Sequence, residues 1–403
     1  MVIKRRLSLF DLSKFFLFCL IFSINIREPF FHTREIFYVF TLITSLFFID
    51  IRKAKYVLIL LGIWGVSITY NIFIPGSNFE INGGAFETII VSAYLFLMCF
   101  CKKKYAKTIV DSYMLSAMVV ALIIIVLWCI VTYDEGTYYT LKAYFDNIYN
   151  ETGLSFIEID YRMILGYRIT SCWYRTSPIL ICSLGICLIE RLKGKKNLLM
   201  VLLFAIALIL SGTRANMMSA VLLMFFYFIF KIRQAGLVIA PVLLVIVTTV
   251  FALTIASLML NDAGSGSSFI KMNDTYSYFK LYDQDILRTL FFGWGPGSTF
   301  YSLGRYKMVS ITELTLFETI RRYGLVSTII IFVNIWFKPF LVKIRYERSG
   351  IKFFYAVVVL AYIITACTNP YLLDSVGFCA LLFFTTYFDY EADLFEGENK
   401  DII

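Results

Sequence analysis

Long apolar runs recur from one end of this chain to the other, and they leave no interval long enough for a soluble domain of normal size. Hydrophobic residues make up 60% of the sequence and charged residues only 16%, whereas a soluble domain is about a quarter charged. A helix of ~20 apolar residues can cross a bilayer because it satisfies its own backbone hydrogen bonds. The sequence therefore predicts an all-α fold, a polytopic integral membrane protein with a single transmembrane domain over residues 1–403.

The apolar runs predict about twelve transmembrane helices, with shorter runs extending into their flanks to reach the required length. The first run follows basic residues as in a signal peptide, but no small-residue cleavage site follows it, so we expect an uncleaved first helix. The expected spans are Phe15–Ile26, Glu35–Ile49, Tyr56–Ile74, Ala85–Cys101, Ile109–Val131, Thr176–Ile189, Leu198–Leu210, Ala215–Phe230, Leu237–Leu260, Ile311–Phe337, Phe353–Cys367 and Val376–Phe388.

The connections between these spans alternate in character, and this alternation predicts the topology. Every second connection is short and basic, as in Lys102-Lys103-Lys104, and the positive-inside rule places that set in the cytoplasm together with both termini. The other connections are richer in Gly, Asn, Asp, Ser and Tyr. Two of these predicted outer connections are long, from about Tyr133 to Arg175 and from about Asn261 to Ser310, and long loops in compact proteins are usually functional or disordered.

Composition also argues against several classes of function. The net charge of +9 comes from basic clusters between apolar runs, which is a membrane-topology pattern, so we expect membrane lipid and not nucleic acid as a partner. The nine cysteines contain no C-x-x-C pair, and His32 is the one histidine, so the sequence predicts no metal site and no cofactor. Most of the cysteines lie in or beside apolar runs, where they act as small apolar fillers.

Arginines gather on the predicted outer side. Charge at membrane depth is expensive and usually functional, and the planar guanidinium makes bidentate, charge-assisted bonds to phosphate. We therefore expect the outer arginines to bind a lipid pyrophosphate; the alternative is that each one simply contacts lipid headgroups. The candidates are Arg162, Arg168 and Arg175 in the first long loop, Arg214 in a tight turn between two spans, and Arg288 in the second long loop.

Charges also line the start of the tenth predicted span. Glu318 precedes Arg321 and Arg322 by three and four residues, which is the spacing of an intrahelical ion pair. Glu313 has no basic residue at that spacing and is the freer candidate for a general base. Glu313 and Glu318 are five residues apart and fall on different faces of a helix, so they are not a paired-carboxylate site.

Three segments, in order, resemble motifs of the O-antigen polymerase and ligase superfamily of bacterial inner-membrane glycosyltransferases. The resemblance covers roughly the second half of the chain, and each motif alone has little specificity. The segments are Trp173-Tyr-Arg-Thr-Ser-Pro178, Ser211-Gly-Thr-Arg-Ala-Asn216, and Phe292-Gly-Trp-Gly-Pro-Gly-Ser298 followed by Glu313-Leu-Thr-Leu-Phe-Glu-Thr-Ile-Arg-Arg-Tyr-Gly324.

The resemblance favours a polymerase (Wzy) over an O-antigen ligase. Ligases of the superfamily open the third motif with a histidine, and here Glu313 stands in that place. The resemblance implies a multi-pass enzyme of the bacterial inner membrane that joins undecaprenyl-pyrophosphate-linked oligosaccharides without metal or cofactor, for O-antigen or a related surface polysaccharide. A chain-length regulator and a flippase would then be partners. Neither the sugar nor the linkage is implied.

Roles follow from this resemblance for individual residues. Arg175, Arg214 and Arg288 would bind the pyrophosphate at one outward cavity, and Arg214 and Glu313 would be catalytic. Arg168 and Trp294 would contact sugar. Arg214→Lys should then impair polymerisation, whereas Arg321, taken as a surface charge, should tolerate lysine. A flippase or other transporter is the rival from a different class, although we find neither repeat symmetry nor charges at mid-membrane.

Overall fold

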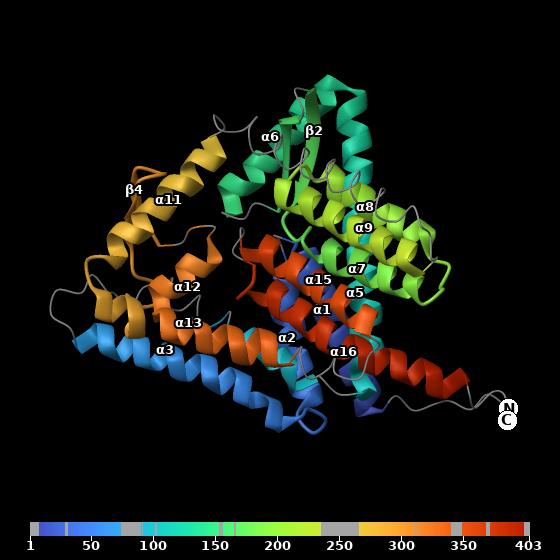
Figure 1. The fold of residues 1–403 in the computed structure, drawn as a ribbon, viewed down its shortest axis with the longest axis horizontal. Coiled ribbons are helices and arrows are strands. Elements are labelled where there is room, and N and C mark those ends of the chain that lie inside the picture. Colours follow the sequence, from blue (N-terminus) through green and yellow to red (C-terminus); the bar gives the residue numbers. More distant parts are fainter. Residues whose placement is uncertain are drawn as a thin grey trace.

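The computed structural model describes residues 8–28, 31–73, 90, 92–100, 103–152, 156–164, 167–234, 266–310, 312, 314–339, 349–367 and 371–398. The chain is mainly helical (Figure 1). The helices are α1 (Leu9–Ile26), α2 (Thr33–Ser45), η1 (Ile51–Ala54), α3 (Lys55–Phe73), η2 (Tyr94–Phe100), α5 (Lys103–Tyr133), α6 (Glu135–Thr152), α7 (Ile179–Leu192), α8 (Leu198–Leu210), α9 (Arg214–Gln234), α11 (Gly266–Tyr282), η3 (Arg288–Phe292), α12 (Thr315–Tyr323), α13 (Leu325–Ile331), η4 (Phe332–Phe337), α15 (Ser349–Cys367) and α16 (Ser375–Glu398). The strands are β1 (Ile157–Ile164), β2 (Tyr167–Tyr174), β3 (Phe300–Ser302) and β4 (Lys307–Val309).

The length and apolar composition of several helices indicate a membrane protein. Within the described ranges, four are long and apolar enough to cross a bilayer, namely Leu9–Ile26, Ile51–Phe73, Lys103–Tyr133 and Arg214–Lys231. Shorter apolar helices include α8 and parts of α15 and α16. The count of twelve spans and their sidedness stay predictions, and the predicted span Leu237–Leu260 lies outside the described residues.

A helical bundle forms the larger part of the core, with α7 at its centre. α7 packs against α5, α8, α9 and α15, and its residues from Ile179 to Ile189 are all buried, as expected for a helix that is apolar all round. At Gly185 the Val358 side chain of α15 packs so closely against α7 that an added Cβ would lie 2.2 Å from Val358 Cγ1. The absence of a side chain at this position therefore sets the spacing of α7 and α15.

Polar side chains inside the bundle find partners across helices. Asn25 Nδ2 of α1 donates to Ser116 Oγ of α5 at 2.8 Å, and the hydroxyls of Ser13 and Tyr105 lie 3.0 Å apart. Such contacts link helices where the surroundings offer little water. They fix α1 against α5 along most of its length.

A second group of elements lies beside the bundle: α3, α11, η3, α12, α13 and the β3–β4 hairpin (Figure 1). α3 and α13 lie side by side, and η3 packs against both. Thr315 Oγ1 of α12 donates to the carbonyl of Ala366 on α15 at 3.2 Å, which joins this group to the bundle.

Both predicted outer loops contain regular structure, so the chain is not purely helical. The first holds α6 and the antiparallel hairpin β1–β2, in which Ile157 pairs with Tyr174. The second holds α11, η3 and the antiparallel hairpin β3–β4. The alternation of buried Ile157 and Ile159 with exposed Glu158 is the strand signal that the all-α prediction missed.

The tenth predicted span, Ile311–Phe337, is not one straight helix. It breaks at Gly324 into α12 and α13, whose axes bend by 119°. Gly324 has φ +83°, a conformation that favours glycine and that a side chain would strain. The glycine therefore permits the change of direction, and the charged residues of α12 do not continue the apolar run of α13.

Candidate functional site

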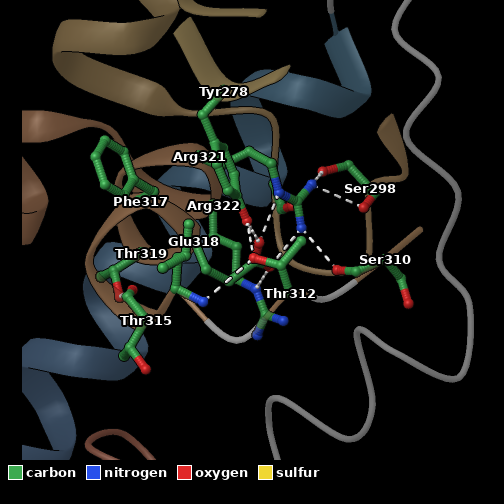
Figure 2. Close-up of polar contacts among 12 residues, drawn as sticks. Tyr278, Ser298, Ser310, Thr312, Thr315, Phe317, Glu318, Thr319, Arg321 and Arg322 are labelled. Atoms are coloured by element: carbon green, nitrogen blue, oxygen red, sulfur yellow. Dashed lines mark hydrogen bonds and ion pairs between the residues drawn. The ribbon is translucent and has the colours of Figure 1, made fainter. Parts of the chain in front are cut away.

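A buried ionic network holds α12 in place (Figure 2). Arg321 is 0% exposed and Glu318 is 6% exposed. The Arg321 guanidinium donates through Nε to Glu318 Oε2 at 3.0 Å and through Nη2 to Glu318 Oε1 at 2.5 Å. It also donates to the carbonyl oxygens of Ser298 and Ser310, both at 2.8 Å, and to Ser298 Oγ. All three of its nitrogens are therefore satisfied.

The network continues to α11 and to the neighbouring arginine. Tyr278 Oη donates to Glu318 Oε2 at 2.7 Å and lies 2.6 Å from Thr312 Oγ1, while Arg322 Nε donates to Glu318 Oε1 at 2.6 Å. Burial, followed by the negative charge of Glu318, raises the pKa of Tyr278 well above its usual range. The phenol therefore keeps its proton and acts as a donor.

These contacts decide two sequence predictions. The ion pair predicted between Glu318 and the two arginines is confirmed. The view of Arg321 as a surface charge is wrong, because its guanidinium is enclosed by α11, α12 and the segment before α12. With its oxygens bound by Tyr278, Arg321 and Arg322, Glu318 has the contacts of a structural residue and not those of a free base.

The glycine-rich turn, residues Gly293–Gly297, packs its backbone against the break between α12 and α13. An added Cβ at Gly293 would lie 2.4 Å from the Arg322 carbonyl carbon, and one at Gly324 would lie 2.7 Å from the Phe291 carbonyl carbon. The backbone N–H of Trp294 donates to the Arg321 carbonyl at 2.6 Å, and this hydrogen bond caps the end of α12. The motif is therefore required for close backbone packing in this fold.

α3 also holds this turn in place. Ser67 Oγ lies 2.7 Å from the carbonyl oxygens of both Phe292 and Arg322, and Asn71 Nδ2 donates to the Gly293 carbonyl at 3.1 Å. The ring of Tyr70 stacks on Phe292 with centroids 3.8 Å apart. The turn is thus fixed between a candidate span and a broken helix.

Trp294 is half-buried, and its ring lies beside that of Tyr282 with centroids 6.0 Å apart. Its predicted contact with sugar stays a prediction.

Arg288 begins η3 immediately before this turn. Its backbone N–H donates to Asp285 Oδ1 at 3.0 Å. Its side chain is partly buried, and the Nε and Nη2 atoms are buried with no hydrogen-bond partner in the described part of the chain. A buried guanidinium nitrogen without a partner is costly, so this site has unmet capacity to bind an acceptor group.

The segments that carry Arg175 and Arg214 lie against each other, although they are distant in sequence. Asn216 Nδ2 donates to Ser177 Oγ at 2.8 Å, just after Arg175. In the turn before Arg214, an added Cβ at Gly212 would lie 2.1 Å from Ser171 Cβ of β2. Both arginines are partly buried. Two of the three arginines predicted to bind pyrophosphate therefore lie on segments that contact each other.

Two further arginines belong to the same region and were missed in the sequence. Arg27, at the end of α1, donates to Asp374 Oδ2 at 3.2 Å. Burial lowers the pKa of the Arg27 guanidinium, the charges of Arg175 and Arg34 lower it further, and Asp374 opposes them. Arg34 and Arg175 therefore both lie within electrostatic range of Arg27, and all three arginines lie within range of the Asp374 carboxylate.

The carboxylates in this region also have structural partners. Asp374 Oδ1 accepts the N–H groups of Val376 and Gly377 at the start of α16, and Arg34 donates to Glu35 Oε1 at 2.9 Å. Arg27 and Arg34 flank the first predicted outer connection and Asp374 lies in the last one. Their charged side chains in short predicted outer connections were the available sequence signal.

Two predicted site residues remain undescribed in part or in full. Glu313 lies outside the described residues. Arg168 belongs to β2 and pairs with Met163 in the hairpin register, but its side chain lies outside what the structure describes. Their roles stay predictions. Among the described residues, no group of His, Cys, Asp and Glu has the arrangement of a metal site.

No protein-family model fits this chain, and no curated protein or solved structure shows significant similarity to it.

Proposed function

We propose that this chain is a glycosyltransferase that joins lipid-pyrophosphate-linked oligosaccharides at the outer face of a bacterial inner membrane. A growing glycan on undecaprenyl pyrophosphate would be the donor, and a hydroxyl of a second lipid-linked repeat would attack its anomeric carbon. The new glycosidic C–O bond forms as the bond to the pyrophosphate oxygen breaks. The hydroxyl proton passes to a base, for which Glu313 is the candidate, and arginines stabilise the charge of the departing pyrophosphate.

One observation carries this proposal: the buried, unpartnered nitrogens of Arg288. The guanidinium of Arg321, which is fully buried on α12, has every nitrogen satisfied within the protein. Arg288 therefore differs from Arg321 in having two buried donors without a hydrogen-bond partner beside a tight backbone turn. A pyrophosphate supplies oxygen acceptors in the geometry that a guanidinium fork matches.

The neighbouring segments of Arg175 and Arg214 add a second source of positive charge. Two of the three arginines chosen from the sequence lie on segments joined by the hydrogen bond between Asn216 and Ser177. We further propose that Arg175, Arg214 and Arg288 face one cavity.

Purified protein in detergent, supplied with a synthetic lipid-pyrophosphate-linked repeat, tests the proposal directly. A polymerase makes dimers and longer glycans, resolved as a ladder on a gel. Arg288→Lys keeps the charge but loses the fork, and loss of one such contact typically slows the reaction about a hundredfold. Arg191→Lys is the matched control, because Arg191 lies at the far end of α7 and its Nε bonds Tyr227 Oη. Equal ladders from the two variants would remove Arg288 from the site.

A transporter of lipid-linked oligosaccharides is the second candidate, favoured by the break between α12 and α13. Discontinuous helices are typical of transporter binding sites. In detergent no transport can occur, so glycan products in the assay above exclude transport as the sole activity. A protein that yields no product in detergent, but moves a fluorescent lipid-linked repeat across a vesicle membrane, would be a transporter.

An O-antigen ligase would instead move the glycan to a lipid A core acceptor. Glu313 replaces the histidine that opens the third ligase motif, which favours polymerisation. Adding lipid A core to the assay distinguishes the two products by mass.

A further inference from the structure

One face of α11 carries polar side chains that are buried inside the protein. Asp274, Ser277 and Tyr278 are all buried. Asp274 Oδ1 accepts from the Ser302 hydroxyl, Ser277 Oγ accepts from the Leu303 N–H at 2.8 Å, and Tyr278 belongs to the network of Glu318. The inner face of this helix is therefore held by hydrogen bonds to β3, to the β3–β4 turn and to α12.

The opposite face of α11 is apolar and exposed. Phe269, Met272, Tyr276 and Phe279 follow one another at spacings of three and four residues, which places them in one stripe. They are 47%, 53%, 59% and 54% exposed. A helix against water has the reverse arrangement, with polar residues outside. A contiguous apolar surface of this kind marks contact with lipid or with a partner.

Further apolar side chains are exposed between α11 and a candidate membrane span. Just after α11, Ile286 and Leu287 are exposed, and η3 then exposes Phe291. η3 packs against α3, which is long and apolar enough to cross a bilayer and which exposes Ile72 and Phe73 at that end. Apolar side chains are therefore exposed both at the end of a candidate span and along α11, and the exposed polar residues Asp283 and Gln284 lie between α11 and Ile286.

The direction and charge of α11 fit a helix lying along a membrane surface. In Figure 1, α11 runs across the direction of α3 and α13 and not along it. Lys280 is exposed next to the stripe, where its ammonium can reach lipid headgroups while its stem covers apolar surface. Aromatic residues on the apolar face with a basic residue at its border are typical of interfacial helices.

We propose that α11 is an interfacial helix whose exposed Phe269–Phe279 face lies in the lipid bilayer. This assignment is independent of the enzymatic proposal and gives the chain a lipid contact outside its spans. It also places the Tyr278–Glu318–Arg321 network near the membrane surface, because the same helix contacts lipid on one face and that network on the other.

Photo-crosslinking tests the occupant of this face without changing the native cysteines. Phe279 is replaced by the photoreactive phenylalanine analogue p-benzoylphenylalanine, and the full chain is illuminated in vesicles of phosphatidylethanolamine and phosphatidylglycerol. We expect an adduct shifted by the mass of one phospholipid. The same replacement at Phe269 provides a second position on the stripe, and both side chains are already aromatic and exposed.

Two matched positions calibrate the result. Val126 on α5 is 53% exposed on a candidate span and should give the same lipid adduct. Tyr144 on α6 is 55% exposed, but it lies on a helix whose exposed residues are largely polar, and it should give none. A cross-linked species of twice the chain mass at Phe279 would assign the face to a second copy and overturn the proposal. Lipid adducts at Val126 without any at Phe279 and Phe269, or equal adducts at Tyr144, would overturn it as well.

Discussion

Replacing Arg321 by lysine should destabilise this protein strongly, although the charge is kept. The guanidinium makes five donor contacts, to both oxygens of Glu318, to the carbonyl and hydroxyl oxygens of Ser298 and to the carbonyl of Ser310. A lysine ammonium has three donors on one nitrogen, so at least two of the five buried hydrogen bonds are lost. At about 1.5–3 kcal/mol for each hydrogen bond to a charged group, the loss is about 3–6 kcal/mol of folding free energy.

Unfolding of the purified protein in mixed micelles with increasing dodecyl sulfate, followed by tryptophan fluorescence, measures this change. Arg305→Lys is the matched control: Arg305 is 31% exposed and its Nε lies 3.6 Å from Asp274 Oδ2. For a partly exposed ion pair whose charge is retained, we expect a change below about 1 kcal/mol. If the two lysine variants unfold at the same detergent fraction, the buried fork of Arg321 does not stabilise the fold and our reasoning is wrong.

Three other outcomes follow from the structure. Gly324→Ala places a side chain at φ +83° against the Phe291 backbone and should lower stability by about 1–3 kcal/mol, whereas Gly62→Ala, which meets nothing within 4 Å on α3, should leave the unfolding midpoint unchanged or raise it. Gly185→Ala should destabilise the contact of α7 with α15, and the double variant with Val358→Ala should recover much of the loss in the same unfolding assay; no recovery would place the strain elsewhere. Arg214→Lys should shorten the glycan ladder at matched protein level, and an unchanged ladder would remove Arg214 from the pyrophosphate site.

The membrane character and several spans could be predicted from the sequence because apolar length is a strong, local signal. α5 and the first helix fall where the runs placed them. The i,i+3 and i,i+4 spacing likewise predicted the partners of Glu318, because residues at that spacing meet on a helix whatever surrounds it.

The environment of those residues could not be predicted, because it depends on segments distant in sequence. Arg321 is buried by Ser298, Ser310 and α11, none of which is adjacent to it in the chain. The pairing of Arg27 with Asp374 joins the end of the first helix to the start of the last described one. The local sequence shows which side chains are charged, but the tertiary packing determines which of their donors are left without a hydrogen-bond partner.

The glycine contacts around the α12–α13 break define a signature that can be searched for without knowledge of the substrate. Apolar residues of the spans can exchange for one another as long as volume and hydropathy are kept, so overall identity among relatives can fall very low. Gly293 and Gly324 do not have that freedom, because a Cβ added at Gly293 would lie 2.4 Å from the Arg322 backbone and one added at Gly324 would lie 2.7 Å from the Phe291 backbone. Ser67 and Asn71 add two polar positions on a distant helix at fixed mutual spacing. A sparse pattern of these four positions should detect distant relatives that comparison of whole chains misses.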